Sequence, residues 1–251
     1  MFAEKASPQT FNAKPSDASR NQGVNCRPGL SDRGLSAALH SESSEPDAHD
    51  FEIVVVDDHS PGDVPAILHG LPSDGPVINY IRHDRNRGAL CARLTGIDHS
   101  NGDYVGFIDC DDCAHTAYVQ RLLAAARETD AGIIGSAKNA ANLRPPFQLE
   151  GAEALLDGYA TGKIANWSVW TKLYARPLLE GLAELRAIGT ETNFIKANDL
   201  IFNVFCALQG PRYVNIEETL IAHNRERPGS ATHASSRMLR TGELSVYHCR
   251  L

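Results

Sequence analysis

Short apolar runs alternate with helical periodicities between residues 51 and 136. The β-branched run from Phe51 to Val56 is continuous and ends in two aspartates, which is typical of a buried parallel strand. Similar runs predict further strands at 77–81, 104–108 and 130–136. Helical spacing, as at Leu90, Leu94 and Ile97, predicts helices in the 90–97 and 118–126 regions. This alternation indicates an α/β domain with a mainly parallel sheet flanked by helices.

The pattern after residue 136 is less regular. Residues 152–160 suit a helix, 167–174 form a mixed aromatic segment, and 213–221 suit a strand. Residues 198–208 predict an amphipathic helix that begins at the cap residue Asn198 or Asp199. We expect this half to complete the same single domain as an irregular, acceptor-side half.

The first 50 residues differ from the rest of the chain. They are rich in Ser, Asp, Asn, Pro and Gly and show no sustained apolar period, which is typical of a poorly ordered segment. We therefore divide the chain into an atypical segment, 1–50, and two halves of one domain, 51–135 and 136–251.

Composition narrows the function classes. A net charge of −7 argues against nucleic-acid binding, because phosphate backbones recruit an excess of Lys and Arg. No run approaches the roughly 18–20 apolar residues of a membrane span, and residues 1–20 lack the apolar region of a secretory signal. Six cysteines are too dispersed for a disulfide scaffold. A cytoplasmic protein without a transmembrane segment is expected.

Two acidic clusters follow predicted strands. Asp57 and Asp58 end the first strand, and Asp109, Asp111 and Asp112 follow the strand at 104–108. Ligands of α/β sheets bind beyond the carboxyl ends of the strands. Hard cations such as Mg²⁺ or Mn²⁺ prefer oxygen ligands and often bind through carboxylates plus substrate phosphates. The second cluster therefore predicts a metal site, and the alternative is a solvated acidic turn that caps the next helix.

Basic residues lie between these clusters. Arg87 precedes Gly88 at a loop-to-helix junction, and Arg93 follows within the helix, so either guanidinium could meet phosphate or base edges. An Asp57 or Asp58 carboxylate could accept hydrogen bonds from a base or ribose, or could simply cap a turn. Cys110 and Cys113 also form a C-x-x-C pair, which leaves a redox or zinc protein as a minor alternative.

Three segments of the first half resemble the family 2 glycosyltransferases. Residues 51–60 (FEIVVVDDHS) look like the family strand that ends in V-D-D-G-S, with His59 in place of Gly. Residues 86–96 (NRGALCARLTG) are similar to its N-x-G…A-R-N-x-G helix, with Leu94 in place of Asn. Residues 102–112 (GDYVGFIDCDD) resemble the segment that carries the family's metal motif.

Three further segments extend the resemblance to about residue 232. They are 170–174 (WTKLY), like the W-x-K-L-Y element; 198–202 (NDLIF), like the E-D-x-x-F helix start; and 225–232, like a basic R-x-x-S-x-T stretch. The resemblance implies a GT-A, Rossmann-like fold. It also implies an inverting, metal-dependent transfer from a nucleotide-sugar, with UDP as the expected nucleotide.

The resemblance assigns roles to matching positions. Asp58, supported by Asp57, would contact the uracil or ribose. Asp111 and Asp112, with Asp109, would hold Mn²⁺ or Mg²⁺ against the diphosphate. Asp199 would be the general base that deprotonates a glycan or lipid-linked acceptor. A lipid-linked acceptor would imply work at the inner face of a membrane, and the alternative for Asp199 is a simple helix cap.

Two departures bear on activity. Asn198 stands where the family has Glu, beside the expected base. The family also begins with an apolar strand that ends in Pro, whereas residues 24–31 contain no apolar run. We expect the sheet to have an unpaired edge, or a weaker replacement strand, at this place. The alternative function is therefore a catalytically impaired, nucleotide-binding protein of the same fold. Nucleotidyl transfer is less favoured, because no Gly-rich, Lys-containing phosphate loop is present.

Overall fold

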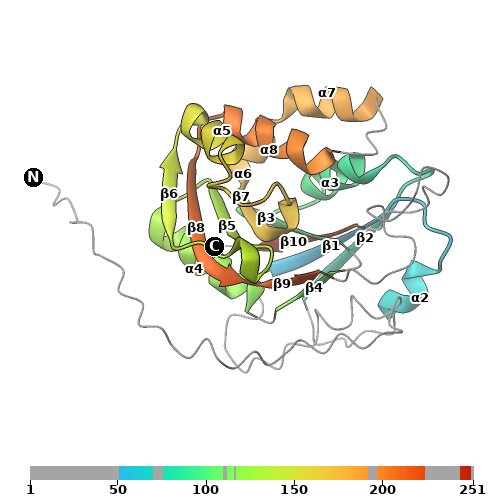
Figure 1. The fold of residues 1–251 in the computed structure, drawn as a ribbon. Helices are drawn as coiled ribbons and strands as arrows, with labels where there is room; N and C mark the ends of the chain where they lie inside the picture. The colour runs from blue at the N-terminus through green and yellow to red at the C-terminus, as the bar shows by residue number, and fades with distance from the viewer. Residues whose placement is uncertain are drawn as a thin grey trace, which may run out of the picture.

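The computed structural model describes residues 51–69, 76–109, 112–115, 117–191, 197–223 and 244–249 (Figure 1). The prediction for residues 1–50 lies outside the described residues. An eight-stranded sheet forms the centre, in the order β2-β1-β10-β3-β7-β5-β8-β6. Its strands are β1 (Phe51–Asp57), β2 (Ile78–Arg82), β3 (Tyr104–Asp109), β5 (Ile133–Ala137), β6 (Phe147–Glu150), β7 (Lys172–Ala175), β8 (Arg212–Thr219) and β10 (Leu244–Cys249).

The sheet is mixed. β1 pairs parallel with β2, and β5 pairs parallel with β8, whereas all other neighbours are antiparallel. Most strands still share one direction, because only β10, β7 and β6 run against the others. A second, two-stranded sheet joins β4 (Asp112–Ala114) to β9 (Ile221–His223).

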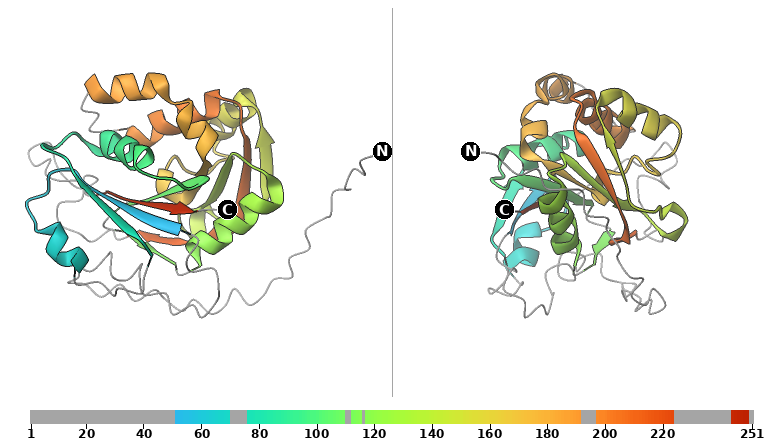
Figure 2. Two further views of the ribbon diagram at one scale, coloured as in Figure 1. Left: turned by 180° about the vertical axis from the view of Figure 1, so that it is seen from behind. Right: turned by 90° about the vertical axis from the view of Figure 1, so that its left-hand side faces the viewer.

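Helices cover both faces of the large sheet, as Figure 2 shows from two further directions. One core cluster joins the sheet to α3 (Ala89–Asp98), α5 (Ala152–Ala160), α6 (Arg176–Glu180), α7 (Ala183–Glu191) and α8 (Asn198–Leu208). The other joins the opposite face to α2 (Val64–His69) and α4 (Tyr118–Thr129). Two 3₁₀ turns complete the connections, η1 (Ala140–Asn142) and η2 (Val169–Thr171). The predicted α/β class, with a helix-flanked sheet, is confirmed.

The residues of β1 show why this strand lies inside. Successive side chains of a strand point to opposite faces, so Val54 and Val56 pack in the cluster with α3, and Ile53 and Val55 pack in the cluster with α4. All four are at most 4% exposed. Burial of each such side chain contributes about 1.5–3 kcal/mol. An uninterrupted apolar run is therefore what a strand covered on both faces requires.

The segments with strong periodicity were predicted correctly. The strands at 51–57, 78–82, 104–109 and 133–137 and the helices at 89–98, 118–129, 152–160 and 198–208 match the expected ones. The start of α8 differs in detail, because its cap residue is Ala197, in a left-handed conformation and without a side-chain cap hydrogen bond. The prediction that Asn198 or Asp199 caps this helix is therefore wrong.

Of the two alternatives expected beside β1, the unpaired edge is wrong, and a replacement strand is present. β10 lies between β1 and β3 and is antiparallel to both, with Leu244 opposite Val56 on one side and opposite Asp109 on the other. Strand pairing depends on residues far apart in sequence, so a short C-terminal strand can occupy a central position that the local pattern leaves empty. Among the described helices, none is both long and apolar enough to cross a bilayer.

A proline in β10 tests its central position. Each interior N–H of β10 faces a neighbouring strand, so Val246→Pro removes one ladder hydrogen bond and should lower the unfolding free energy by about 3 kcal/mol or more. Urea denaturation followed by circular dichroism measures this change. Val246→Thr keeps the N–H and the branched shape and should cost much less. Equal midpoints for Val246→Pro and wild type would contradict the pairing.

Candidate active site at the carboxyl edge of the sheet

Asp57 ends β1 and fastens the loop that follows it. The Asp57 carboxylate accepts hydrogen bonds from the Ser60 N–H (2.7 Å), the Tyr80 hydroxyl (2.8 Å) and Arg82 Nη1 (2.5 Å). Burial raises the pKa of this carboxyl, but the hydrogen bonds from Ser60 and Tyr80 and the charge of Arg82 outweigh burial and hold the pKa below its usual value. Asp57 is thus an anion that ties β1 to β2.

Asp58 points toward the opposite loop and organises the start of α3. Its Oδ1 atom accepts from the Arg87 N–H (2.8 Å) and lies 2.7 Å from His83 Nδ1, and its Oδ2 atom accepts from the Gly88 N–H (2.7 Å). Gly88 has φ 88°, a left-handed conformation that favours glycine. The pair Asp58 and Gly88 therefore fixes how the chain enters α3.

His59 occupies the position where the family motif has glycine. Its φ is 65°, a left-handed conformation that costs a non-glycine residue roughly 1–2 kcal/mol. His59 itself is exposed, and its Nδ1 atom lies 3.4 Å from the His83 carbonyl oxygen. The backbone therefore keeps the turn that the motif glycine would serve, at a cost in strain.

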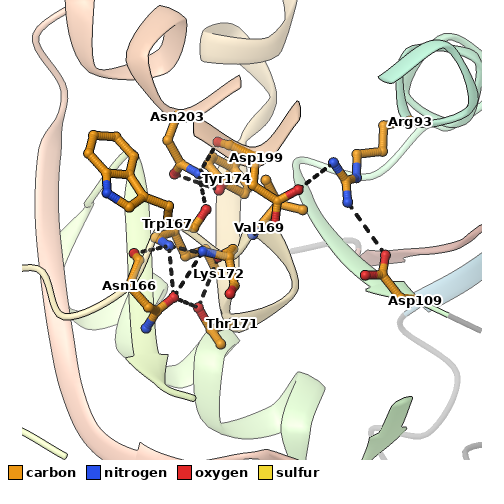
Figure 3. A network of polar contacts seen from close by, with 11 residues as sticks. Arg93, Asp109, Asn166, Trp167, Val169, Thr171, Lys172, Tyr174, Asp199 and Asn203 are labelled. Atoms are coloured by element: carbon orange, nitrogen blue, oxygen red, sulfur yellow. Dashed lines mark hydrogen bonds and ion pairs between the residues drawn. The ribbon is translucent and has the colours of Figure 1, made fainter. Parts of the chain in front are cut away.

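Arg93 lies on the buried face of α3 and joins two carboxylates. Its Nη1 atom is 2.7 Å from Asp199 Oδ1, and its Nη2 atom is 3.5 Å from Asp109 Oδ1 (Figure 3). The side chain is only 3% exposed. Burial lowers the pKa of the guanidinium, but Asp199 and Asp109 outweigh burial and raise the pKa above its ordinary value. A permanent buried cation therefore links α3, the end of β3 and the start of α8.

Asp199 is held from outside its own helix. Besides the Arg93 contact at Oδ1, its Oδ2 atom accepts from the Val169 N–H at 3.3 Å. Its side chain is 30% exposed, and each carboxylate oxygen keeps acceptor capacity beyond these two contacts. Asp199 thus has a fixed orientation and an accessible surface, which are two of the requirements for a general base.

Asn203 ties Asp199 to the segment before β7. Its side-chain amide donates to the Asp199 carbonyl and to the Trp167 carbonyl, both at 2.7 Å. Its Oδ1 atom accepts from the hydroxyls of Tyr159 (2.7 Å) and Tyr174 (3.0 Å). Asn203 is fully buried with all these bonds made, so the first turn of α8 is anchored to the core.

The described part of the predicted metal cluster consists of Asp109 and Asp112. Asp109 ends β3 with its side chain 29% exposed, and Asp112 begins β4 and is 3% exposed. Asp111 and Cys110 lie outside the described residues. Among the residues that are described, no group of three His, Cys, Asp or Glu side chains could hold a metal ion.

The aromatic residues of the 167–174 segment differ in burial, and burial decides which of them could stack on a sugar. Trp170 and Tyr174 are core residues, at 4% and 0% exposed. Trp167 is partly buried and stacks on Tyr159, with ring centroids 4.0 Å apart. Trp170 and Tyr174 therefore belong to the core and do not offer a face for a sugar ring.

The structure brings three of the predicted residues into one cluster, Arg93, Asp109 and Asp199. Asp57 and Asp58 lie at the same edge of the sheet but point into the loops, and Arg87 approaches Asp58 through its backbone. The contributions of Val169 and Asn203 were missed. The W-x-K-L-Y element lies beside Val169 in the sequence, but it does not predict that the Val169 N–H donates to the Asp199 carboxylate.

Removing the Arg93 guanidinium should leave Asp109 and Asp199 without their shared cation. Hydrogen bonds to charged groups contribute about 1.5–3 kcal/mol, so Arg93→Met, which removes the bond to Asp199, should unfold at a lower urea concentration than wild type. Arg186→Met is the control, because Arg186 pairs with the half-exposed Asp98 and should change stability by about 1 kcal/mol or less. Equal effects of the two variants would contradict the bridging role.

Comparison with solved structures identifies the fold. Staphylococcus aureus TarS 1-349 in complex with UDP-GlcNAc matches with a TM-score of 0.62 and 19% identity, over 81% of this chain and 56% of that chain. TarS 1-349 without a named ligand matches with a TM-score of 0.59 and 17% identity, over 76% and 54%. The expected GT-A fold is thereby confirmed.

Sequence comparison identifies the family. The family model for glycosyl transferase family 2 matches residues 33–156. EpsJ of Bacillus subtilis, an uncharacterized glycosyltransferase, is 31% identical over 194 residues, which are 73% of this chain and 55% of that protein. The GalNAc(5)-diNAcBac-PP-undecaprenol beta-1,3-glucosyltransferase of Campylobacter jejuni is 29% identical over 122 residues, 47% of this chain and 39% of that enzyme. The chain thus spans about half the length of these relatives or less. Together with the fold, these matches show that the chain belongs to glycosyltransferase family 2.

Proposed function

We propose that the protein transfers a sugar from a nucleotide-sugar, with UDP as the nucleotide, to a hydroxyl acceptor, and that it inverts the anomeric centre. The observation that carries this proposal is the held but accessible carboxylate of Asp199, fixed by Arg93 and Val169 at the edge where β3 ends in Asp109. In this proposal the base lies across the Arg93 bridge from Asp109, one of the proposed donor-site residues.

Asp199 acts as the general base in this proposal. The acceptor hydroxyl gives its proton to an Asp199 oxygen, and the hydroxyl oxygen bonds to the anomeric carbon as the bond to the nucleoside diphosphate breaks. Attack and departure on opposite faces invert the configuration. Because Arg93 and Val169 hold the carboxylate, its approach to the hydroxyl is set before the acceptor arrives.

The donor site combines the two acidic clusters. Asp111 and Asp112, with Asp109, would hold Mn²⁺ or Mg²⁺, since carboxylate oxygens are the ligands these ions prefer. A bound ion would stabilise the negative charge of the departing diphosphate. Asp57 and Asp58 are each 1% exposed, so in this proposal they would serve the uracil or ribose by fixing the loops after β1 and β2 that border it, and Arg87 and Arg93 would add positive charge nearby.

The names of two relatives support a proposal for the acceptor class. The Campylobacter jejuni relative is named for an undecaprenol-linked acceptor, and a Rhizobium meliloti relative, 35% identical over 91 residues, is a succinoglycan biosynthesis protein. We infer that this chain takes part in glycan or cell-surface polysaccharide synthesis. A lipid-linked acceptor would bring it to the inner membrane surface.

UDP binding should depend on the metal. Calorimetric titration of the full chain with UDP should show binding with Mn²⁺, and binding should be lost or strongly weakened when EDTA removes the metal. Asp111→Ala should abolish the metal-dependent part, because it removes a proposed ligand. Asp157→Ala, an exposed carboxylate on α5, is the control and should bind as wild type. Absence of binding by a folded wild-type sample would contradict the donor proposal.

Loss of the base should separate binding from turnover. Asp199→Asn keeps the size of the side chain but removes the proton acceptor, so kcat should fall by about 10²–10⁴-fold while UDP binding with Mn²⁺ stays near wild type. Turnover is measured as UDP released from a panel of UDP-sugars with polyprenyl-linked acceptors. Asp157→Asn should retain full activity, and unchanged turnover by Asp199→Asn would exclude the proposed base.

An impaired, nucleotide-binding protein is the second candidate function. Asn198 favours it, because the neighbour of the base is an amide where the family has a carboxylate. The same two experiments decide between the candidates. Metal-dependent UDP binding with no turnover on the panel would favour the impaired protein, and binding with turnover would favour the transferase.

A further inference from the structure

Lys172 is a buried lysine at the start of β7, and the proposed function gives it no role. It is 1% exposed, and its Nζ atom donates to the Ser168 carbonyl (2.7 Å) and the Asn166 carbonyl (3.0 Å), with Asn166 Oδ1 at 3.4 Å. Among the described residues, Lys172 forms no ion pair with a carboxylate. The hydrogen bonds of its ammonium group to described residues therefore all go to oxygens of one turn, residues 166–169 (Figure 3).

Other contacts keep this turn compact. Asn166 Oδ1 accepts from the Ser168 N–H (3.1 Å) and from the Thr171 hydroxyl (2.9 Å), which also lies 3.0 Å from the Ser168 carbonyl. The next residue, Val169, presents its N–H to Asp199 Oδ2. Lys172 thus holds the turn whose last residue, Val169, donates its N–H to Asp199.

The surroundings of Lys172 make its burial costly. The Tyr159 ring of α5 lies 5.7 Å from Nζ, and α8 faces it with Cys206 and with Asp199. Burial lowers the pKa of Lys172 to about 7, against the attraction of Asp199. An apolar residue would fill this space without that penalty, so the carbonyl contacts are what the lysine adds.

We propose that Lys172 is a positioning residue for Asp199, which holds the 166–169 turn so that the Val169 N–H binds and orients the carboxylate. This inference rests on the proposed function, in which Asp199 is the base. Lys172 itself touches no substrate. Its effect is to keep Asp199 Oδ2 bound to the turn, while Oδ1 binds Arg93 and both oxygens keep acceptor capacity for the incoming hydroxyl.

Lys172→Met tests the proposal with two readouts. The first is amide hydrogen exchange of Val169, which should become at least about tenfold faster when the charge-assisted contacts of the turn are lost. Exchange in β3 should stay unchanged. The second is a split of kinetic constants for UDP release: kcat should fall at least about tenfold, while the donor KM and UDP binding with Mn²⁺ stay within about twofold.

Further variants serve as controls and as backup. Lys163→Met removes an exposed lysine that lies over the Phe147 ring, and it should change neither readout. Thr171→Val removes hydroxyl contacts to the same turn without removing the charge, and it should raise Val169 exchange by about threefold, as expected for one neutral hydrogen bond. If Lys172→Met does not fold, Lys172→Gln, which removes the charge but keeps a polar side chain, is the backup.

The outcomes separate this inference from the proposed function. Unchanged Val169 exchange in Lys172→Met, or in Lys172→Gln where Lys172→Met does not fold, would overturn the holding of the turn by Lys172. Faster exchange with wild-type kcat would overturn the positioning of the base. A wild-type protein that neither binds UDP nor releases it would refute the proposed function, and the exchange readout would still decide whether Lys172 holds the turn.

Discussion

The buried guanidinium of Arg93 is the interaction on which the arrangement of the site depends. A buried cation is costly unless it is paired, and here its two partners come from different elements, Asp109 at the end of β3 and Asp199 at the start of α8. α3 supplies the cation between them. The first half of the domain supplies Arg93 and Asp109, and the ion pair of Arg93 with Asp199 fastens α8 of the second half to it.

Carboxylates at this edge of the sheet serve two purposes, which their exposure separates. Asp57 and Asp58 are each 1% exposed, and their oxygens bind the loops that follow β1 and β2. Asp109 and Asp199 are 29% and 30% exposed and share one cation. The inward pair builds the edge, whereas the outward pair keeps acceptor capacity toward solvent. One residue type thus provides both the frame and the candidate chemistry.

Local pattern was enough to predict most of the first half and the bounds of α8. Buried strands such as β1 carry continuous apolar runs, and α8 has a clear helical period, so each was predictable from a short stretch of sequence. The central position of β10 was not, because pairing between Leu244 and Asp109 spans more than half the chain. For the same reason, the motifs indicated that Asp199 matters but not which groups hold it. The Arg93 and Val169 contacts exist only after β3, β7 and α8 have packed together.

The start of α8 shows how this packing prepares a base. An aspartate that caps its own helix would use its carboxylate on the first-turn amides and would move with the helix alone. Asp199 does not cap α8, which begins after Ala197 without a side-chain cap. Its two oxygens instead bind Arg93 from α3 and the Val169 N–H from the turn before β7. The orientation of the carboxylate is therefore defined by the domain as a whole, and a shift of either half would change the angle at which it meets an acceptor hydroxyl.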